Sequence, residues 1–93
     1  MANNLVVSYE LHKPDQNYDT VIARIKTLGS WARVHRSVWY VKSACTAKDA
    51  ATQIWAVMDA NDSLIVLDLS NNTAAWMKLD PQVSQFLQQQ WFA

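Results

Sequence analysis

The order in which two hydrophobic periods follow one another constrains the fold of this chain more than any other feature. Strands show apolar residues at alternate positions or in short runs, whereas amphipathic helices show them three and four residues apart. The run from Leu5 to Tyr9 is β-branched and aromatic, which predicts a strand that ends in a loop around Pro14. From Tyr18 to Leu28 the apolar residues have helical spacing, which predicts a helix that stops at Gly29.

The middle of the chain predicts further strands and a second helix. Residues 31–36 and 38–41 are rich in aromatic and β-branched side chains and predict two tightly joined strands, or one long bent strand. Thr46 is followed three residues later by Asp49, a pattern typical of a helix N-terminus, and apolar residues continue at helical spacing to Met58. Residues 63–69 are nearly all apolar, so we expect a strand covered on both faces rather than an edge strand.

The last part of the chain predicts a short strand and a final helix. Residues 74–79 are expected to form the strand. Asp80 and Pro81 supply a cap and a first-turn proline for a helix whose apolar residues, ending at Trp91, share one stripe. The order β-α-β-β-α-β is that of the ferredoxin-like split βαβ sandwich. Because 93 residues suit one domain, we predict a single α+β domain over 1–93, with a short fifth strand and a C-terminal helix.

One face of such a sheet is left uncovered by the two helices that connect its strands. A partner, a ligand or the C-terminal segment must shield any apolar side chains there. Along the first strand, residues 5, 7 and 9 share one side and residues 6, 8 and 10 share the other. If the first set packs under the helices, Glu10 points towards the uncovered face. We expect a second copy of the chain to cover that face, and therefore predict a homodimer.

The composition excludes several classes of protein. Apolar residues make up 51% and the formal net charge is zero, which argues against disorder and against a protein that coats nucleic acid by bulk charge. The single glycine excludes phosphate-binding glycine-rich loops, and the single cysteine, Cys45, excludes an internal disulfide. The apolar runs, such as the four residues from Leu64 to Leu67, are far shorter than the roughly 18 residues of a membrane span, and residues 1–11 do not resemble a signal peptide. We therefore expect a cytoplasmic protein without a membrane segment.

The charges are nevertheless unevenly distributed. Residues 1–48 hold seven basic and three acidic side chains, a balance of +4, and residues 49–93 hold one basic and five acidic ones, a balance of −4. Trp31, Arg33 and His35 alternate along the predicted second strand, and such a basic and aromatic stripe could stack on bases and contact phosphates. The alternative is that the aromatic residues fill the core and a dimer interface. The candidate phosphate contacts are Arg33, His35, Arg36 and Lys42.

Two short motifs carry a resemblance to a known family. The segment from Leu5 to Leu11, which contains Tyr9-Glu10, and the segment from Arg33 to Trp39, which ends in Ser-Val-Trp, resemble the Cas2-type proteins. They are more similar still to the small SinR-like relatives of that family outside CRISPR loci. The resemblance spans about residues 4–79, and Asp62 to Leu67 resembles the fourth strand of the family.

The resemblance implies a ferredoxin-fold homodimer whose sheets meet face to face. Some Cas2-like proteins are metal-dependent nucleases in which strand-tip acids of two protomers lie near a shared ion, and others are non-catalytic scaffolds. Glu10 stands at the position of the strand-tip Asp, and its longer side chain would displace the ion or demand a wider gap. Asp62, at the start of the antiparallel strand, could supply a second ligand to Mg²⁺ or Mn²⁺. The alternative is a solvated or Arg-paired Glu10.

These observations predict a Cas2-like homodimer that acts by binding, with nucleic acid as the leading partner. Metal-dependent endonuclease activity through Glu10 is a further hypothesis. An alternative from another class is an antitoxin or immunity protein that neutralises a basic toxin by direct binding, because residues 49–93 carry a charge of −4. A third alternative is a purely structural dimer.

Overall fold

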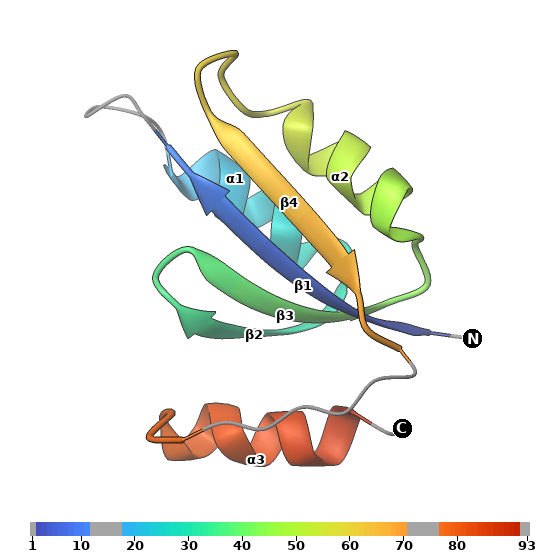
Figure 1. The fold of residues 1–93 in the computed structure, drawn as a ribbon, viewed down its shortest axis with the longest axis vertical. Coiled ribbons are helices and arrows are strands. Elements are labelled where there is room, and N and C mark those ends of the chain that lie inside the picture. Colours follow the sequence, from blue (N-terminus) through green and yellow to red (C-terminus); the bar gives the residue numbers. More distant parts are fainter. Residues whose placement is uncertain (1, 12–17, 71–76, 92–93) are drawn as a thin grey trace.

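A computed structural model describes residues 2–11, 18–70 and 77–91 of the chain (Figure 1). Over these residues the fold is a small α+β arrangement of a four-stranded antiparallel sheet and three helices, so the predicted α+β class is confirmed. The strands are β1 (Asn3–Glu10), β2 (Gly29–His35), β3 (Val38–Ser43) and β4 (Ser63–Asp68). The helices are α1 (Tyr18–Lys26), α2 (Ala47–Trp55) and α3 (Pro81–Gln90).

The strands lie in the order β2-β3-β1-β4, and every neighbouring pair is antiparallel. The central strand β1 places Val7 opposite Trp39 of β3 on one side and opposite Val66 of β4 on the other. The strands β2 and β4 are therefore the two edges of the described sheet. This order also separates the first and second halves of the chain, because the β2 edge and the β4 edge come from different halves.

One core lies between the sheet and the helices α1 and α2. Alternate residues of β1 point into it, as the predicted parity requires, and Glu10 is exposed on the other face. The helix α2 begins where predicted, because the Thr46 side chain accepts a hydrogen bond from the Asp49 backbone N–H. The buried residues of this core are Leu5, Val7, Tyr9, Val21, Ile25, Leu28, Trp39, Val41, Ala50 and Ile54.

A second, smaller core lies on the opposite face of the sheet, between α3 and the strands β2 and β3 (Figure 1). Tyr40 points to this side because its neighbours in β3, Trp39 and Val41, belong to the first core. Its ring stacks on Trp91, with 5.6 Å between the ring centroids, and Leu87 is buried beside it. The chain's own helix therefore covers the half of this face that β2 and β3 form, where we expected a second copy.

The prediction that β4 is not an edge strand is wrong, and the chain itself covers only one face of β4. Leu64 and Val66 pack against the first core, but Ile65 and Leu67 on the other face are 53% and 42% exposed. The strand lies at the edge of the sheet, and α3 lies over β2 and β3 instead. A continuous apolar run therefore marks a strand here without identifying what covers its second face.

Half of the predicted fifth strand, residues 74–76 of 74–79, lies outside the described residues. Its described part, Met77 to Leu79, is not in a strand, and Lys78 has a left-handed backbone with φ of 58°. None of the helices in the described ranges is long and apolar enough to cross a bilayer.

Candidate functional site

Two cationic and two aromatic side chains form a row at the outer strand β2, on the face that α1 covers. The Lys26 ammonium lies 4.4 Å from the centroid of the Trp31 ring. The Trp31 ring is in turn 5.4 Å from the ring of Trp39, centroid to centroid. The Arg33 guanidinium carbon lies 5.2 Å from the centroid of the Trp39 ring. We call these four residues the cationic-aromatic row.

Local structure explains how the row forms. Trp31 and Arg33 are two residues apart in a strand, so they share a face, and Trp39 lies directly opposite Arg33. Lys26 reaches Trp31 because α1 ends there and a tight connection leads to Gly29. That connection requires glycine, since a Cβ at residue 29 would lie 2.0 Å from the Lys42 carbonyl oxygen.

The row has one fixed indole and one accessible indole. Trp39 is buried in the first core at 1% exposure, whereas Trp31 is 39% exposed. Cation–π contacts at exposed sites stabilise by about 0.5–1 kcal/mol each, which is enough to orient side chains but not to lock them. The buried ring therefore supports an outer ring that a ligand can reach.

The turn between β2 and β3 brings further basic groups to the same end of the hairpin. The Nε and Nη2 atoms of Arg33 donate hydrogen bonds of 3.2 and 2.7 Å to the carbonyl oxygen of Arg36. Arg36 and His35 are both exposed beside it. Three of the four candidate phosphate contacts, Arg33, His35 and Arg36, therefore lie at one end of the hairpin.

The predicted stripe of Trp31, Arg33 and His35 on one face is wrong at its last member. An irregularity between Arg33 and His35 shifts the register, so that His35 lies opposite Val38. Val38 is in turn opposite Ser8, on the face away from α1 and α2. Strict alternation ends at this bulge, and His35 belongs to the opposite face from Trp31 and Arg33.

Lys42 does not join the other three candidates. It lies four residues beyond Val38, about 13 Å along β3, at the end of the strand away from the hairpin turn. Its ammonium donates a hydrogen bond of 3.0 Å to Oδ1 of Asn4. The same oxygen accepts from the Tyr40 hydroxyl at 2.7 Å, so Lys42 takes part in a polar network under α3. Burial raises the pKa of Tyr40 to about 12.

The two predicted metal ligands lie on opposite faces of the sheet. The strand partner of Glu10 is Ser63, so Asp62, one residue earlier in the chain, points to the other side. Asp62 is only 7% exposed, and its Oδ2 accepts a hydrogen bond of 2.8 Å from the Asp59 backbone N–H, which closes the turn before β4. The ranges that the structure describes contain no group of three or more His, Cys, Asp or Glu side chains that could hold a metal ion.

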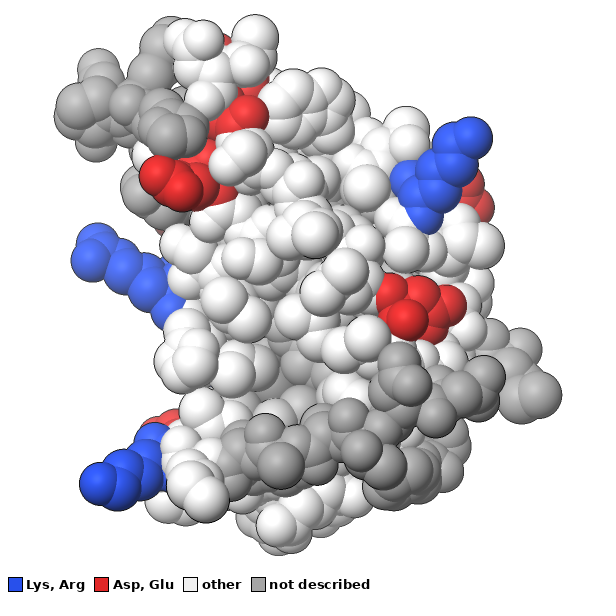
Figure 2. Space-filling model, in the orientation of Figure 1, with Lys and Arg blue, Asp and Glu red and all other residues white. Residues whose placement is uncertain are grey.

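The charge asymmetry of the sequence maps onto opposite edges of the sheet. Residues 18–43, which form α1, β2 and β3, hold five basic side chains and one acidic one. Residues 47–68, which form α2 and β4, hold four acidic side chains and one basic one. On the side of the molecule that Figure 2 shows, charged groups lie mostly around the rim and the centre is uncharged. Each edge of the sheet thus offers an electrostatically distinct surface.

Sequence reasoning missed Lys26 as a member of the site. The residue ends a predicted helix, and only the tight connection through Gly29 brings it over Trp31, five residues later. A helix-terminal lysine followed by a glycine and an exposed strand tryptophan was the available signal. Comparison with known proteins adds no relative, because no family model and no curated protein matches the chain.

Proposed function

We propose that this chain is a small Cas2-like protein of ferredoxin-like fold that acts by binding, with single-stranded nucleic acid as its leading partner. Support for the fold comes from the antiparallel order β2-β3-β1-β4 and from the packing of α1 and α2 on one face. The single observation that carries the function is the cationic-aromatic row on β2. The row combines an accessible indole, Trp31, that carries the Lys26 ammonium with a second cation, Arg33, on the buried indole of Trp39 beside it. Stacking surfaces together with cations are what single strands require.

In this proposal a base stacks on the outer face of Trp31. The Lys26 ammonium moves from the ring towards a neighbouring phosphate, while Trp39 holds the indole from behind. Arg33 and Arg36 contact the following phosphates at the hairpin turn, and His35 approaches from the other side of the strand. Stacking of this kind does not select a sequence, because every base has a π-face.

The test is the affinity for a fluorescently labelled single-stranded oligonucleotide, measured by anisotropy. Trp31→Ala removes the stacking surface and should weaken binding about fivefold to a hundredfold, since one base–aromatic stack contributes about 1–3 kcal/mol. Trp55→Ala is the matched control, because Trp55 is also exposed but belongs to α2 near the opposite edge of the sheet. Equal affinities for Trp31→Ala and the wild type would contradict the proposal.

The homodimer remains part of the proposal. On the sheet face that carries α3, the part that α3 leaves uncovered holds Ile65 and Leu67 of β4, which are both more than 40% exposed, beside the half-buried Val6 of β1. A second copy would remove this apolar surface from water. Light scattering should therefore give a dimer for the wild type and a monomer for Ile65→Lys. A wild type that stays monomeric at high concentration would exclude this interface.

Endonuclease activity stays a prediction that depends on the dimer. Because Glu10 and Asp62 lie on opposite faces, a shared ion would need the Glu10 carboxylate of a second copy. Cleavage that requires Mg²⁺ or Mn²⁺ and disappears in Glu10→Ala would support the activity. Equal cleavage by the wild type and the variant would identify a contaminating nuclease.

The antitoxin or immunity function is a second candidate. It is favoured by the apolar and acidic side chains at the β4 edge of the sheet. The exposed Ile65 and Leu67 lie near Asp68, in a segment with an excess of acidic side chains, and such a surface suits a basic protein. Capture of a stoichiometric protein partner free of nucleic acid would support this candidate. Co-purification of RNA or DNA would support the first one.

A further inference from the structure

The edge strand β4 has backbone groups that point away from the sheet. In an antiparallel pair, residues bond to the neighbouring strand at alternate positions, and the residues between them turn their N–H and C=O groups the other way. The Leu69 backbone N–H donates to the Asn4 carbonyl oxygen at 2.8 Å, which fixes the positions that bond to β1. Ile65 and Leu67 have the same parity as Leu69, so they also face β1. The outward positions of β4 are Leu64, Val66 and Asp68.

The outer edge of β4 is regular along its described length. Its pairing with β1 continues without a shift over all six residues, whereas the β2 edge has a bulge between Arg33 and His35. Proteins usually protect an edge strand from pairing with other chains by bulges, prolines or lysines. The β4 sequence, SLIVLD, contains neither proline nor lysine. This edge is therefore suited to accept a further strand.

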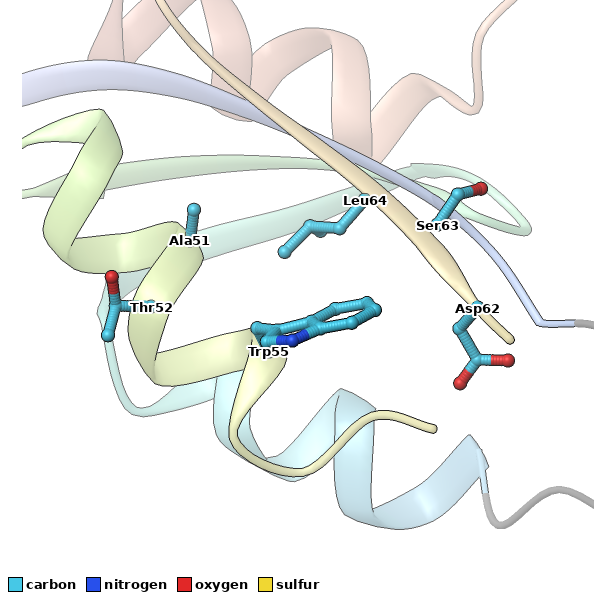
Figure 3. A pocket seen from close by; sticks show the side chains of 6 residues that line it. All are labelled: Ala51, Thr52, Trp55, Asp62, Ser63 and Leu64. Carbon is cyan, nitrogen blue, oxygen red and sulfur yellow. The ribbon is translucent and has the colours of Figure 1, made fainter. Parts of the chain in front are cut away.

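A hollow of about 530 Å³ lies beside this edge, between α2 and the start of β4 (Figure 3). Leu64 points into it from the strand, and the Trp55 indole extends from the end of α2 towards β4. Ala51 and Thr52 complete the wall that the helix forms. An added strand would run about 4.8 Å outside β4, with its side chains alternating between the two faces of the sheet. The side chain opposite Leu64 would therefore enter the hollow.

The lining of the hollow and the nearby charge define what that strand must carry. Trp55 is 43% exposed and Leu64 is half-buried, so an apolar side chain between them would remove apolar surface from water. Residues 47–68 hold four acidic side chains and one basic one. The exposed Asp68 ends the strand, and although its Oδ1 accepts from the Ser70 backbone N–H, its charge favours a cation on the strand opposite.

The same charge argues against a second copy of β4 as the added strand. Antiparallel self-pairing with the greatest overlap places Val66 opposite its own copy and Asp68 opposite Leu64. A carboxylate would then enter an apolar hollow at an edge that is already acidic, which is unfavourable. A strand of different sequence avoids this conflict.

We propose that β4 binds an extended segment of a partner protein as an added antiparallel strand. In that segment an apolar residue lies opposite Leu64, and a lysine or arginine four residues earlier lies opposite Asp68. The outward backbone groups supply affinity, and the hollow and the acidic end of the strand select alternate side chains. The proposal goes beyond nucleic-acid binding at β2 and does not depend on it, because the two use opposite edges of the sheet. It also uses the edge of β4 rather than the sheet face proposed for the homodimer.

The test is a titration of the full chain with the peptide acetyl-Lys-Thr-Val-Thr-Leu-amide, followed by ¹H–¹⁵N correlation spectra. In the proposed register its leucine lies opposite Leu64, its valine opposite Val66 and its lysine opposite Asp68. Saturable shifts are expected for the amides of β4 and for the indole N–H of Trp55. The expected dissociation constant is on the order of 1 mM, since the peptide is short and flexible.

Hydrogen exchange of the β4 amides gives a readout with an internal control. The bound peptide should slow exchange at Leu64, Val66 and Asp68, whose N–H groups point outward. Ile65 and Leu67 already bond to β1, so their exchange should not change. Equal slowing at both sets of amides would indicate general stabilisation of the fold and would overturn the proposal.

Modified peptides separate the backbone contribution from the charge. N-methylation of the valine removes a donor that faces β4 and should weaken binding about fivefold or more. N-methylation of the second threonine alters an N–H that faces away from β4, and should leave the affinity within about twofold. Glutamate in place of the lysine should weaken binding about two- to fivefold at low salt, through repulsion by Asp68.

Two variants of α2 test the hollow. Trp55→Ala removes the aromatic wall and should weaken binding of the peptide about three- to tenfold. Gln53→Ala is the matched control, because Gln53 is exposed on the same helix but does not line the hollow, and its affinity should stay within about twofold of the wild type.

Three further results would overturn the proposal. They are the absence of saturable shifts with the peptide, equal affinities for the two N-methylated peptides, and equal affinities for Trp55→Ala and Gln53→Ala. The protein alone provides one more comparison. Slower exchange of the outward amides of β4 at increasing protein concentration, without peptide, would assign this edge to a second copy and would likewise overturn the proposal.

Discussion

Asn4 shows how a single side chain can hold two layers of this molecule together. The residue is 1% exposed, on the central strand, and its side-chain amide forms hydrogen bonds to residues of β3 and to the end of α3. Nδ2 donates to the Trp91 carbonyl oxygen at 2.6 Å, and Oδ1 accepts from the Tyr40 hydroxyl and the Lys42 ammonium. A buried polar group that loses its partner retains its full desolvation cost, so this network depends on each member.

Replacement of Asn4 by alanine should therefore destabilise the fold. The variant leaves the Tyr40 hydroxyl and the Trp91 carbonyl without their partner, and the free energy of unfolding should fall by about 1–3 kcal/mol. Urea unfolding followed by circular dichroism measures the change. Ser8→Ala, on the same face of β1, serves as the control and should stay within about 0.5 kcal/mol of the wild type. Equal losses in the two variants would show that the network does not stabilise the fold.

Tyr40 should make the stability of the protein fall at high pH. Burial raises its pKa to about 12, whereas an unfolded tyrosine ionises at about 10. Between these values the unfolded chain has released the phenolic proton and the folded chain still holds it, so the free energy of unfolding decreases as the pH rises. At the upper value the loss is about 2–3 kcal/mol. Urea unfolding across this range should decline less steeply for Tyr40→Phe, and parallel curves would contradict the effect.

At the scale of elements, α3 shows how far an amphipathic pattern can be predicted from the sequence. The Asp80 side chain accepts from the Gln82 backbone N–H and Pro81 occupies the first turn, so the start of the helix is confirmed. Leu87 and Trp91 face the sheet, as the predicted apolar stripe requires. The stripe predicts that one face is buried but not against which element, because several uncovered surfaces have the same hydrophobic character.

Leu87→Ala should undock α3 in part. The side chain is 4% exposed between the helix and the sheet, and removal of a buried leucine costs about 2–5 kcal/mol. Gln88→Ala, on the exposed side of the same helix, should have little effect. Hydrogen exchange of the β2 and β3 amides reports the docking, and faster exchange is expected in the leucine variant only. Unchanged protection of these amides would mean that α3 is not needed to cover the sheet.

The β2–β3 hairpin and β4 show why the face of His35, the exposure of β4 and the positions of the two acids could not be predicted from the sequence. Period-two reasoning placed Trp31 and Arg33 on one face, but the bulge that removes His35 from it has no glycine or asparagine to mark it. The apolar run of β4 suggested a doubly covered strand, yet coverage depends on where a distant helix docks. Glu10 and Asp62 were expected to be neighbours, but one residue of offset in an antiparallel register places them on opposite faces.

At the scale of the whole molecule, the topology converts a charge difference along the chain into one across space. The sheet order assigns β2 to one edge and β4 to the other, so the basic and acidic halves of the sequence separate. The sequence alone gives the size of the charge difference between the two halves of the chain, because that size follows from a count of charged residues. Its direction in space depends on strand order, which only the assembled sheet defines.

The proposed binding of single strands should weaken with salt in proportion to the number of phosphates contacted. For single strands the slope of log affinity against log salt is about −0.7 per contact, so Lys26, Arg33 and Arg36 together predict about −2. Arg36→Gln should reduce the magnitude of the slope by about 0.7, while Lys48→Gln, on the acidic side, should not change it. Anisotropy titrations at several salt concentrations measure both slopes. An identical slope for Arg36→Gln and the wild type would remove this arginine from the interface.

The hydrogen bond between Asn4 and Trp91 also has a consequence for synthesis of the protein. It joins residues that are 87 positions apart, and Trp91 belongs to the layer that shields Tyr40. Before the ribosome has added α3, the strands that are already made expose the face that carries Tyr40 to solvent. Nascent chains at this stage should therefore be the form most prone to aggregate and most in need of a chaperone.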